Sequence, residues 1–98
     1  MSYDILPTIL GNSIPVKLIE FFIVNENGLY QLTDIAKMLK ISHSRVHDLI
    51  GNLTRMRIIF ETKQGRNRLF ELNKDNPIVK QLKELFKITR AYKIASGI

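Results

Sequence analysis

The stretch from Ile41 to Ile59 groups side chains that suit the reading of DNA bases. For a helix from about residue 43 to 55, at about 100° per residue, Val46, Leu49, Ile50 and Leu53 fall within one narrow arc, and polar side chains surround Gly51 on the opposite side. Arginine pairs bidentately with guanine in the major groove, and asparagine pairs with adenine. Glycine is a poor helix former, so its central place indicates close approach by another molecule. The predicted contact residues are Ser42, His43, Ser44, Arg45, His47, Asp48, Asn52 and Arg55.

An ordinary solvated helix face is the alternative interpretation of this stretch. Asp48 fits DNA contact least well, because a carboxylate is repelled by phosphates. It would need to pair with Arg45, with Arg55 or with a cytosine amine.

A second group of cations follows in a glycine-bearing turn that contains no acid. Residues 58–62 and 68–72 are rich in Ile, Phe, Leu and Thr, and the turn between them predicts a β-hairpin. Cations at its tip would neutralise phosphates or enter the minor groove. The alternative is a charged turn that blocks edge-to-edge pairing of strands. The residues predicted to contact DNA are Lys63, Arg66, Asn67 and Arg68.

Other chemistry has little support in the sequence. His43 and His47 are four residues apart, but a metal site would need a third ligand from Asp48 or from a partner chain. The stretch lacks the H-E-x-x-H pattern of zinc peptidases. No catalytic triad, paired acid cluster or phosphate-cradling glycine loop is present. We therefore expect two groove-facing or partly packed histidines, no metal, no cofactor and no enzyme.

Composition favours a small folded domain with an anionic partner. The chain has 98 residues, 45% of them apolar, and a net charge of +6. Residues 1–36 hold one Lys against four acids, and residues 37–98 hold fourteen Lys or Arg against five. There is no Cys, which excludes disulfides and Cys-based metal centres and fits a reducing cytoplasm. No signal peptide and no apolar run of about 20 residues is visible, so we expect no membrane association.

The candidate residues need helices to position them. A first helix is expected after the N-cap Ser13, with Pro15 in its first turn and a stop at Asn27-Gly28. Residues 29–32 read as a short extended link, one strand of a small sheet. A second helix is expected after an N-cap at Thr33. After a turn at residues 40–41, a third helix is expected from about residue 43 to 55, capped by Ser42.

A long helix is expected at the C-terminus, opened by an Asn76 cap and Pro77. Its apolar residues are spaced 4-3-4-3, which predicts a short heptad seam. We expect it to join two copies of the chain, helped by the segment around Ile5, Leu6 and Ile9; packing on its own core or binding a different protein are the alternatives. The predicted homodimer interface is Ile78, Leu82, Leu85, Phe86, Thr89, Tyr92 and Ile94.

These elements together predict a fold that is mainly α with a small β-hairpin. Residues 1–74 would form a winged helix-turn-helix, and residues 75–98 a long amphipathic helix within the same compact unit. In that architecture the third helix enters the major groove and the hairpin reaches the flanking backbone.

The stretch "LTDIAKMLKISHSRVHDLIGNLTRMRII" resembles the helix-turn-helix of small winged-helix regulators of the ArsR/MarR type. The flanks "LGNSIPVKLIEFFIVNENG" and "GRNRLFELNKDNPIVKQLKEL" are similar to a compact archaeal branch, so the resemblance covers roughly residues 9–88. It implies a sequence-specific regulator that binds double-stranded DNA as a homodimer. Many such proteins end the third helix with Ala-Gly, where Met56-Arg57 stands here. Metalloid-sensing members use cysteines, which this chain lacks, so any effector stays unknown.

A winged-helix module that binds protein or RNA, with an incidental basic face, is the competing hypothesis. Salt dependence separates the two, because binding through several phosphate contacts weakens steeply as salt rises. An apolar protein interface lacks that dependence.

Overall fold

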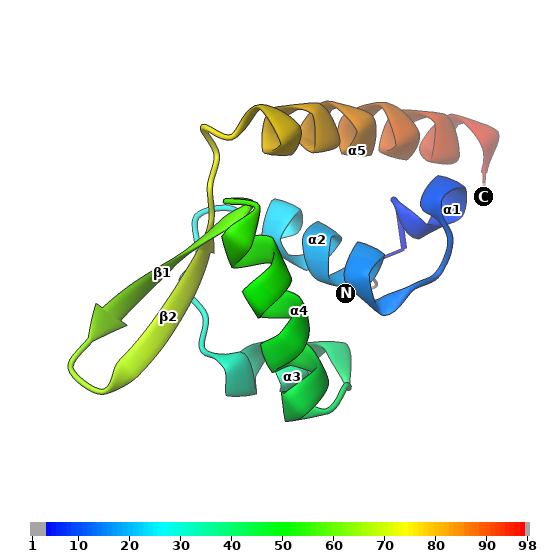
Figure 1. Cartoon of the computed structure of the whole chain (residues 1–98). Coiled ribbons are helices and arrows are strands. Elements are labelled where there is room, and N and C mark those ends of the chain that lie inside the picture. The colour runs from blue at the N-terminus through cyan, green and yellow to red at the C-terminus, as the bar shows by residue number, and fades with distance from the viewer. Residues whose placement is uncertain (1–3, 98) are drawn as a thin grey trace.

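The computed structural model of the protein describes residues 4–97. The long terminal helix lies along one end of the molecule, and the helix-turn-helix extends to the opposite end with the hairpin beside it (Figure 1). This is the winged helix-turn-helix with a long C-terminal helix that the sequence predicts. The elements in order are α1 (Pro7–Leu10), α2 (Ile14–Val24), α3 (Leu32–Leu39), α4 (His43–Arg55), β1 (Ile59–Gln64), β2 (Asn67–Leu72) and α5 (Pro77–Ser96).

Helix α2 begins as expected and ends earlier than expected. The Ser13 side chain accepts a hydrogen bond from the Val16 backbone N–H at 3.4 Å. The helix stops at Val24, three residues before the predicted stop at Asn27-Gly28. The cause is Asn25, whose backbone N–H and side-chain amide both donate to the Phe21 carbonyl and so close the last turn.

Helix α3 corrects one predicted cap. Thr33 is not the N-cap, because the helix already begins at Leu32 and its N-cap is Gln31. The Asp34 carboxylate accepts the Gln31 backbone N–H at 3.2 Å, and this reciprocal contact fixes the earlier start. Lys40, with φ +56, ends α3 in the left-handed conformation and produces the predicted turn into α4.

The hairpin is tighter than predicted. Its strands pair from Ile59 opposite Leu72 to Gln64 opposite Asn67, so only Gly65 and Arg66 form the turn. Gly65 has φ +61, which a two-residue hairpin loop requires at this position. Lys63, Asn67 and Arg68 therefore lie on strands and not in the turn. We use "wing" for residues 59–72.

The extended link before α3 contributes a single residue to the sheet. Tyr30 and Phe70 exchange two backbone hydrogen bonds, of 3.0 and 2.8 Å. The Tyr30 ring also packs against Phe21 at 4.9 Å between ring centroids. Through Tyr30, these contacts connect β2 of the wing to α2 and fix the position of the hairpin on the domain.

The core sits where α2, α3, α4 and β2 meet. Phe21, Phe22 and Phe70 are fully buried, and Ile35 and Val46 fix the two helices of the helix-turn-helix against them. Burial of aromatic side chains of this size dominates the stability of a small domain. The rigid packing leaves the opposite faces of α3 and α4 to solvent.

A buried carboxylate holds the N-terminal segment against α2. The Glu20 side chain is 0% exposed. One of its oxygens accepts the Ile5 backbone N–H at 3.0 Å, and the other accepts the Leu6 backbone N–H. Leu6 is also fully buried, so polar and apolar contacts together position α1.

The exit of α4 uses a left-handed residue other than glycine. Arg57 has φ +58, the conformation in which glycine is usual after a helix. Its carbonyl accepts hydrogen bonds from the side-chain amides of Asn73 at 2.9 Å and Asn76 at 2.8 Å. Asn76 also caps α5, because its side-chain oxygen accepts the Ile78 N–H at 2.7 Å. One side chain therefore joins the end of α4 to the start of α5.

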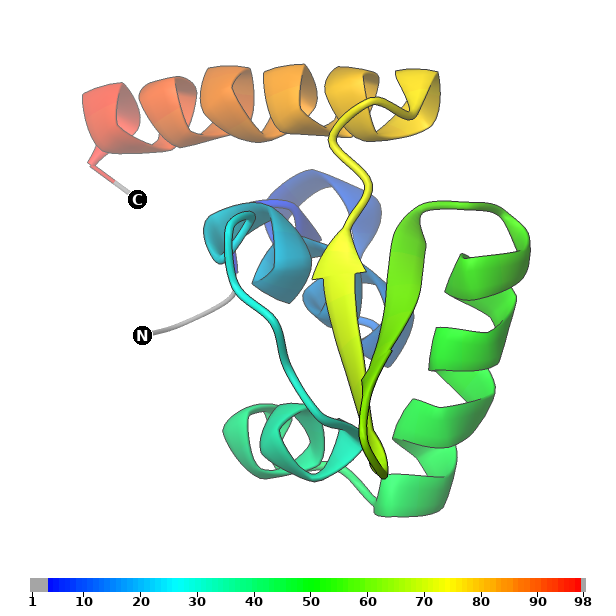
Figure 2. The ribbon, with the colours of Figure 1, turned by 90° about the vertical axis from the view of Figure 1, so that its left-hand side faces the viewer.

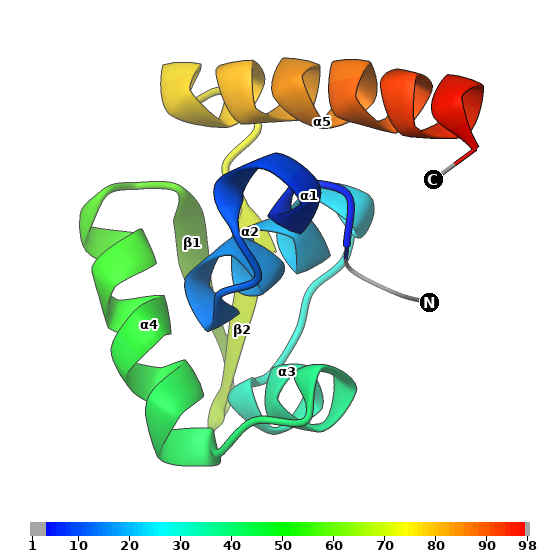
Figure 3. The same cartoon turned by 90° about the vertical axis from the view of Figure 1, so that its right-hand side faces the viewer.

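Helix α5 crosses the molecule on the side opposite α3 (Figures 1 and 3). Its inner face packs on the domain through Val79, Leu82 and Phe86. Two ion pairs fasten it, Lys83 to Glu26 at 2.6 Å and Lys93 to Asp4 at 3.4 Å. Across residues 4–97, no helix is long and apolar enough to span a bilayer.

Candidate nucleic-acid interface

Helix α4 has the bounds that the sequence predicts, and its N-cap is Ser42, whose side chain accepts the Arg45 N–H at 3.2 Å. Val46, Leu49 and Ile50 anchor one side of the helix in the core. Every predicted contact residue of this helix is exposed, so the structure brings them together on one surface. We call this the α4 surface: Ser42, His43, Ser44, Arg45, His47, Asp48, Asn52 and Arg55.

Gly51 lies in the middle of the α4 surface. A Cβ atom built there would meet only the Arg55 side chain, at 3.7 Å. Neither packing nor backbone conformation within the chain therefore requires glycine, although it costs helix stability. The position therefore leaves the α4 backbone open to solvent without an internal need for glycine.

A hollow of about 220 Å³ opens beside Gly51, between α4 and the base of the wing. Its walls include His47, Arg55 and Arg68, with Glu61 among them. The lining thus offers hydrogen-bond donors to an anion while one carboxylate limits the net charge.

Two polar residues of the α4 surface are already paired with each other. The Arg55 guanidinium donates to the Asn52 side-chain oxygen. Adenine recognition by asparagine needs that oxygen as an acceptor and the amide nitrogen as a donor. A carboxamide oxygen has two lone pairs, so this contact leaves one acceptor position and the amide nitrogen of Asn52 open to another molecule.

Asp48 lies next to His47, and not next to Arg45 or Arg55 as considered from the sequence. Its carboxylate lies 3.6 Å from His47 Nδ1, and both side chains are well exposed. The pair is ionic only when the histidine is protonated. Among the described residues, no group of three His, Cys, Asp or Glu could hold a metal ion.

The wing separates its cations into paired and unpaired ones. Arg68 donates two hydrogen bonds to the Glu61 carboxylate, of 2.8 and 2.9 Å, and lies over the Phe70 ring at 5.4 Å. The hydrogen bond from Arg68 lowers the pKa of Glu61 and, in return, Glu61 raises the pKa of Arg68. Lys63 and Arg66 are exposed and form no ion pair within residues 4–97, so they supply the unneutralised charge of the wing.

The sequence interpretation named no contact residue on α3 or at its C-cap, where two cations lie. Lys37 and Lys40 are exposed near the turn that leads into α4. The first helix of a helix-turn-helix crosses the DNA backbone, where lysines would contact phosphates. Two lysines in the last turn before the Ser42 cap were the available signal.

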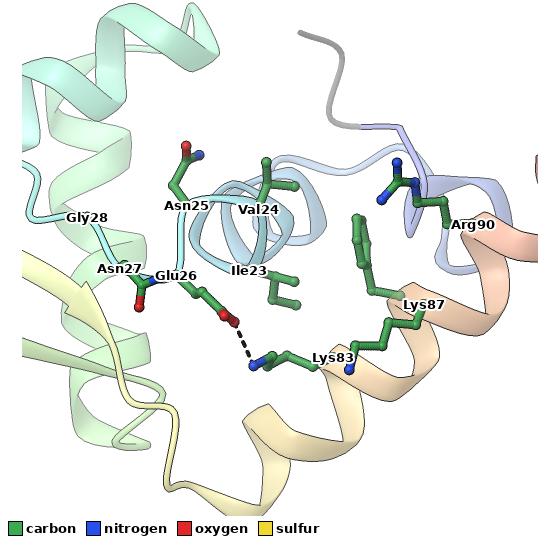
Figure 4. A pocket seen from close by; sticks show the side chains of 10 residues that line it. Ile23, Val24, Asn25, Glu26, Asn27, Gly28, Lys83, Lys87 and Arg90 are labelled. Carbon is green, nitrogen blue, oxygen red and sulfur yellow. Dashed lines mark ion pairs between the residues drawn. The ribbon is translucent and has the colours of Figure 1, made fainter.

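A larger hollow, of about 550 Å³, lies away from the α4 surface, between the end of α2 and α5 (Figure 4). Phe86, Lys87 and Arg90 form its α5 wall, and the ion pair between Glu26 and Lys83 crosses its edge. The hydrogen bond from Lys83 lowers the pKa of Glu26. This hollow contains no residue of the α4 surface or the wing in its lining.

The predicted interface on α5 divides between two sides of the helix. Thr89 is only 7% exposed in a single chain, and Leu82, Leu85 and Phe86 are partly buried against the core, so these four contact their own domain. Ile78 and Tyr92 are exposed. Ile94 is exposed too, but it lies on the lysine-bearing side of the helix. Ile88 is 54% exposed but was not among the predicted interface residues.

The arrangement of these elements is a winged helix-turn-helix fold. No family profile and no curated protein sequence matches the chain. Among solved structures, MepR from Staphylococcus aureus, a transcription regulator of the multidrug efflux pump MepA, is 18% identical with a TM-score of 0.63. A MepR mutant bound to an oligodeoxyribonucleotide is also 18% identical, with a TM-score of 0.70. A possible transcriptional regulator from Methanosarcina mazei is 13% identical, with a TM-score of 0.62.

The matches extend over most of this chain but less of the others. They cover 81%, 96% and 96% of this chain in the same order. The chain spans 60% and 68% of the two MepR chains and 81% of the Methanosarcina chain. At these identities the likeness defines the fold.

Proposed function

We propose that the protein is a sequence-specific regulator of transcription that binds double-stranded DNA as a homodimer. The observation that carries this proposal is the α4 surface, where exposed base-reading side chains surround a glycine that the fold does not need. Exposed cations lie on the wing (Lys63 and Arg66) and around the end of α3 (Lys37 and Lys40), and none of them forms an ion pair with another of residues 4–97. DNA phosphates would lie beside them. One structure of the same fold is bound to an oligodeoxyribonucleotide.

The finer class follows from the resemblance already described. We infer a small cytoplasmic regulator of the ArsR/MarR type and of archaeal kind, which uses no metal or cofactor and performs no catalysis. The test of the main proposal is a selection of bound duplexes from random DNA, followed by titration against salt. We expect one enriched sequence and an affinity that falls steeply with salt. An affinity that is insensitive to salt would favour the protein-binding alternative, and preference for single-stranded RNA would favour the RNA-binding one.

Base reading by α4 gives the first prediction. Arg45→Ala and Asn52→Ala are each expected to cost about 1–3 kcal/mol on the selected site and to relax base choice there. Binding to random duplexes should change less. Arg90→Ala is the matched control, because it removes the same charge from α5, far from α4. Equal losses for Arg45→Ala and Arg90→Ala would assign the effect to net charge alone.

Gly51 gives a prediction in which stability and binding move in opposite directions. Gly51→Ala is expected to raise the free energy of unfolding by about 0.5–1 kcal/mol, because alanine is the better helix former and its Cβ has room. The same methyl group should weaken duplex binding by holding DNA away from the backbone. Urea unfolding and fluorescence anisotropy measure the two effects. Unchanged binding in the stabilised variant would remove Gly51 from the interface.

The wing gives a prediction that separates its two arginines. Arg66→Ala is expected to weaken binding to every duplex alike and to lower the salt slope by about one. Arg68→Ala should lower the slope by less, because Glu61 already neutralises this guanidinium. Equal changes in slope would show that Arg68 leaves Glu61 when DNA binds.

A further inference from the structure

Helix α5 carries an exposed row of side chains beside the face that packs on its own domain. Ile78 is 44% exposed, Ile88 54% and Tyr92 75%; Leu85 between them is half-buried, because part of its side chain packs on its own core. A shallow apolar hollow of about 380 Å³ lies at its N-terminal end. Successive positions alternate by three and four residues, the spacing of a coiled-coil seam. We call these positions the α5 stripe: Ile78, Gln81, Leu85, Ile88, Tyr92 and Ala95.

We propose that the α5 stripe pairs with the same stripe of a second copy in antiparallel orientation, in the register that places Leu85 opposite Ile88. This inference rests on the proposed homodimer and adds its orientation and register. Three independent features of the chain support it: the placement of α5, the sizes of the facing side chains, and the charges beside them.

The placement of α5 excludes a parallel pair. Figures 1, 2 and 3 are related by rotation about the vertical axis. In each view α5 runs across that axis, at the end of the molecule opposite the α3–α4 turn. Two α4 helices reach one duplex only if the two-fold axis runs from α5 towards that turn, because the DNA two-fold crosses the duplex axis. Such an axis crosses α5 and makes the two helices antiparallel. A two-fold axis parallel to α5 would make the pair parallel, and the α4 surface of the second copy would then point away from the duplex bound by the first.

The direction of the stripe agrees with this axis. At about 100° per residue, its centre lies roughly 110° around α5 from the inner face that contains Val79 and Phe86. The stripe therefore points neither into its own domain nor directly away from it, but to one side of α5. A second α5 can lie beside the first, with both domains on the same side of the pair.

Side-chain sizes complement each other in the antiparallel register. Ile78 then faces the small Ala95, Leu85 faces Ile88, and Gln81 faces Tyr92. The last pair lets the Tyr92 hydroxyl and the Gln81 amide satisfy each other at the edge of the seam. In a parallel pair each residue would face its own copy, so Ala95 would leave a void and the two tyrosines would crowd each other.

Charges beside the stripe are compatible with the same register. Glu84, the only acid of α5, borders the stripe and pairs with Lys87 of its own chain at 3.5 Å. Lys80, Lys83 and Arg90 are at least roughly 110° around the helix from the stripe, so like charges do not face each other.

Disulfide trapping tests the orientation directly, because the protein has no cysteine of its own. Ile78→Cys and Ala95→Cys change exposed positions at opposite ends of the stripe. The two full-length variants, one with a mass tag, are mixed and oxidised mildly. We expect the mixed pair to link at least tenfold more than either variant links to itself. In the antiparallel register the two copies of Ile78 in a dimer would stand about 25 Å apart, so cysteines introduced there would be far beyond disulfide reach of each other.

The outcomes distinguish this inference from the proposed function. Self-linking of Ile78→Cys would overturn the antiparallel orientation, and equal linking of all combinations would overturn the register. Ile94→Cys, exposed but off the stripe, is the matched control and should not link. No linking at all, with the parent dimeric by sedimentation, would move the interface elsewhere. DNA binding is measured separately on the reduced variants, so its failure would count against the proposed function only.

Discussion

Replacing Glu20 with glutamine is expected to lower the free energy of unfolding by about 3 kcal/mol. Both oxygens of this fully buried carboxylate accept backbone N–H groups, one from Ile5 and one from Leu6. Glutamine offers one oxygen and one N–H donor, so one backbone N–H would face another donor in the interior. The loss combines a charge-assisted hydrogen bond with an unsatisfied buried group. Chemical denaturation followed by circular dichroism measures it.

A matched variant shows whether burial is the cause. Glu84→Gln removes the same charge from an exposed position of α5 and should change stability by less than about 0.5 kcal/mol. If the two variants unfolded at the same denaturant concentration, the contacts of Glu20 would contribute nothing beyond its charge. A selective loss for Glu20→Gln, with α1 becoming open to proteolysis, would confirm that this carboxylate holds the N-terminal segment.

Placing charges on the α5 stripe is expected to reduce affinity for a two-half-site duplex by at least about 100-fold, or about 2.8 kcal/mol. Ile88→Glu with Tyr92→Glu would set four carboxylates into the pair. Because both residues are exposed in a single chain, the domain should still fold. The second half-site would then no longer bind as part of the same molecule. Sedimentation equilibrium and anisotropy on the selected duplex measure the two consequences.

The control for this prediction is Ile94→Glu, which adds a carboxylate at an equally exposed position away from the stripe. It should leave the dimer intact and weaken DNA binding only slightly, through one unit of charge. If Ile94→Glu and the stripe variant lost affinity equally, the effect would be electrostatic and the stripe would have no special role.

Local signals made the helix-turn-helix predictable. Ser42 caps α4 and the apolar residues repeat at the helical period, so both bounds of α4 agree with the prediction. Asn76 and Pro77 define the start of α5 in the same way. Thr33 is not the N-cap because the Asp34 carboxylate accepts the Gln31 backbone N–H, and the helix therefore begins earlier, at Leu32.

Features that depend on distant residues were beyond the sequence. The pair between Arg68 and Glu61 requires the exact strand register, which the turn length sets. The burial of Glu20 becomes visible only when the N-terminal segment folds back onto α2. On α5, two interleaved apolar rows fit the same helix, and only the position of the domain assigns Thr89 to the inside and Ile88 to the outside.

The hydrogen bonds of Asn76 make the junction between α4 and α5 a stiff joint. Its amide nitrogen donates to the Met56 and Arg57 carbonyls, while its oxygen caps α5. A helix of 20 residues is about 30 Å long. A tilt of α5 by a few degrees at its N-terminus therefore displaces its C-terminus by about an ångström or more. Packing in the dimer and the separation of two α4 helices would therefore be mechanically linked. A substitution that loosens Asn76 would let one protein tolerate several half-site spacings.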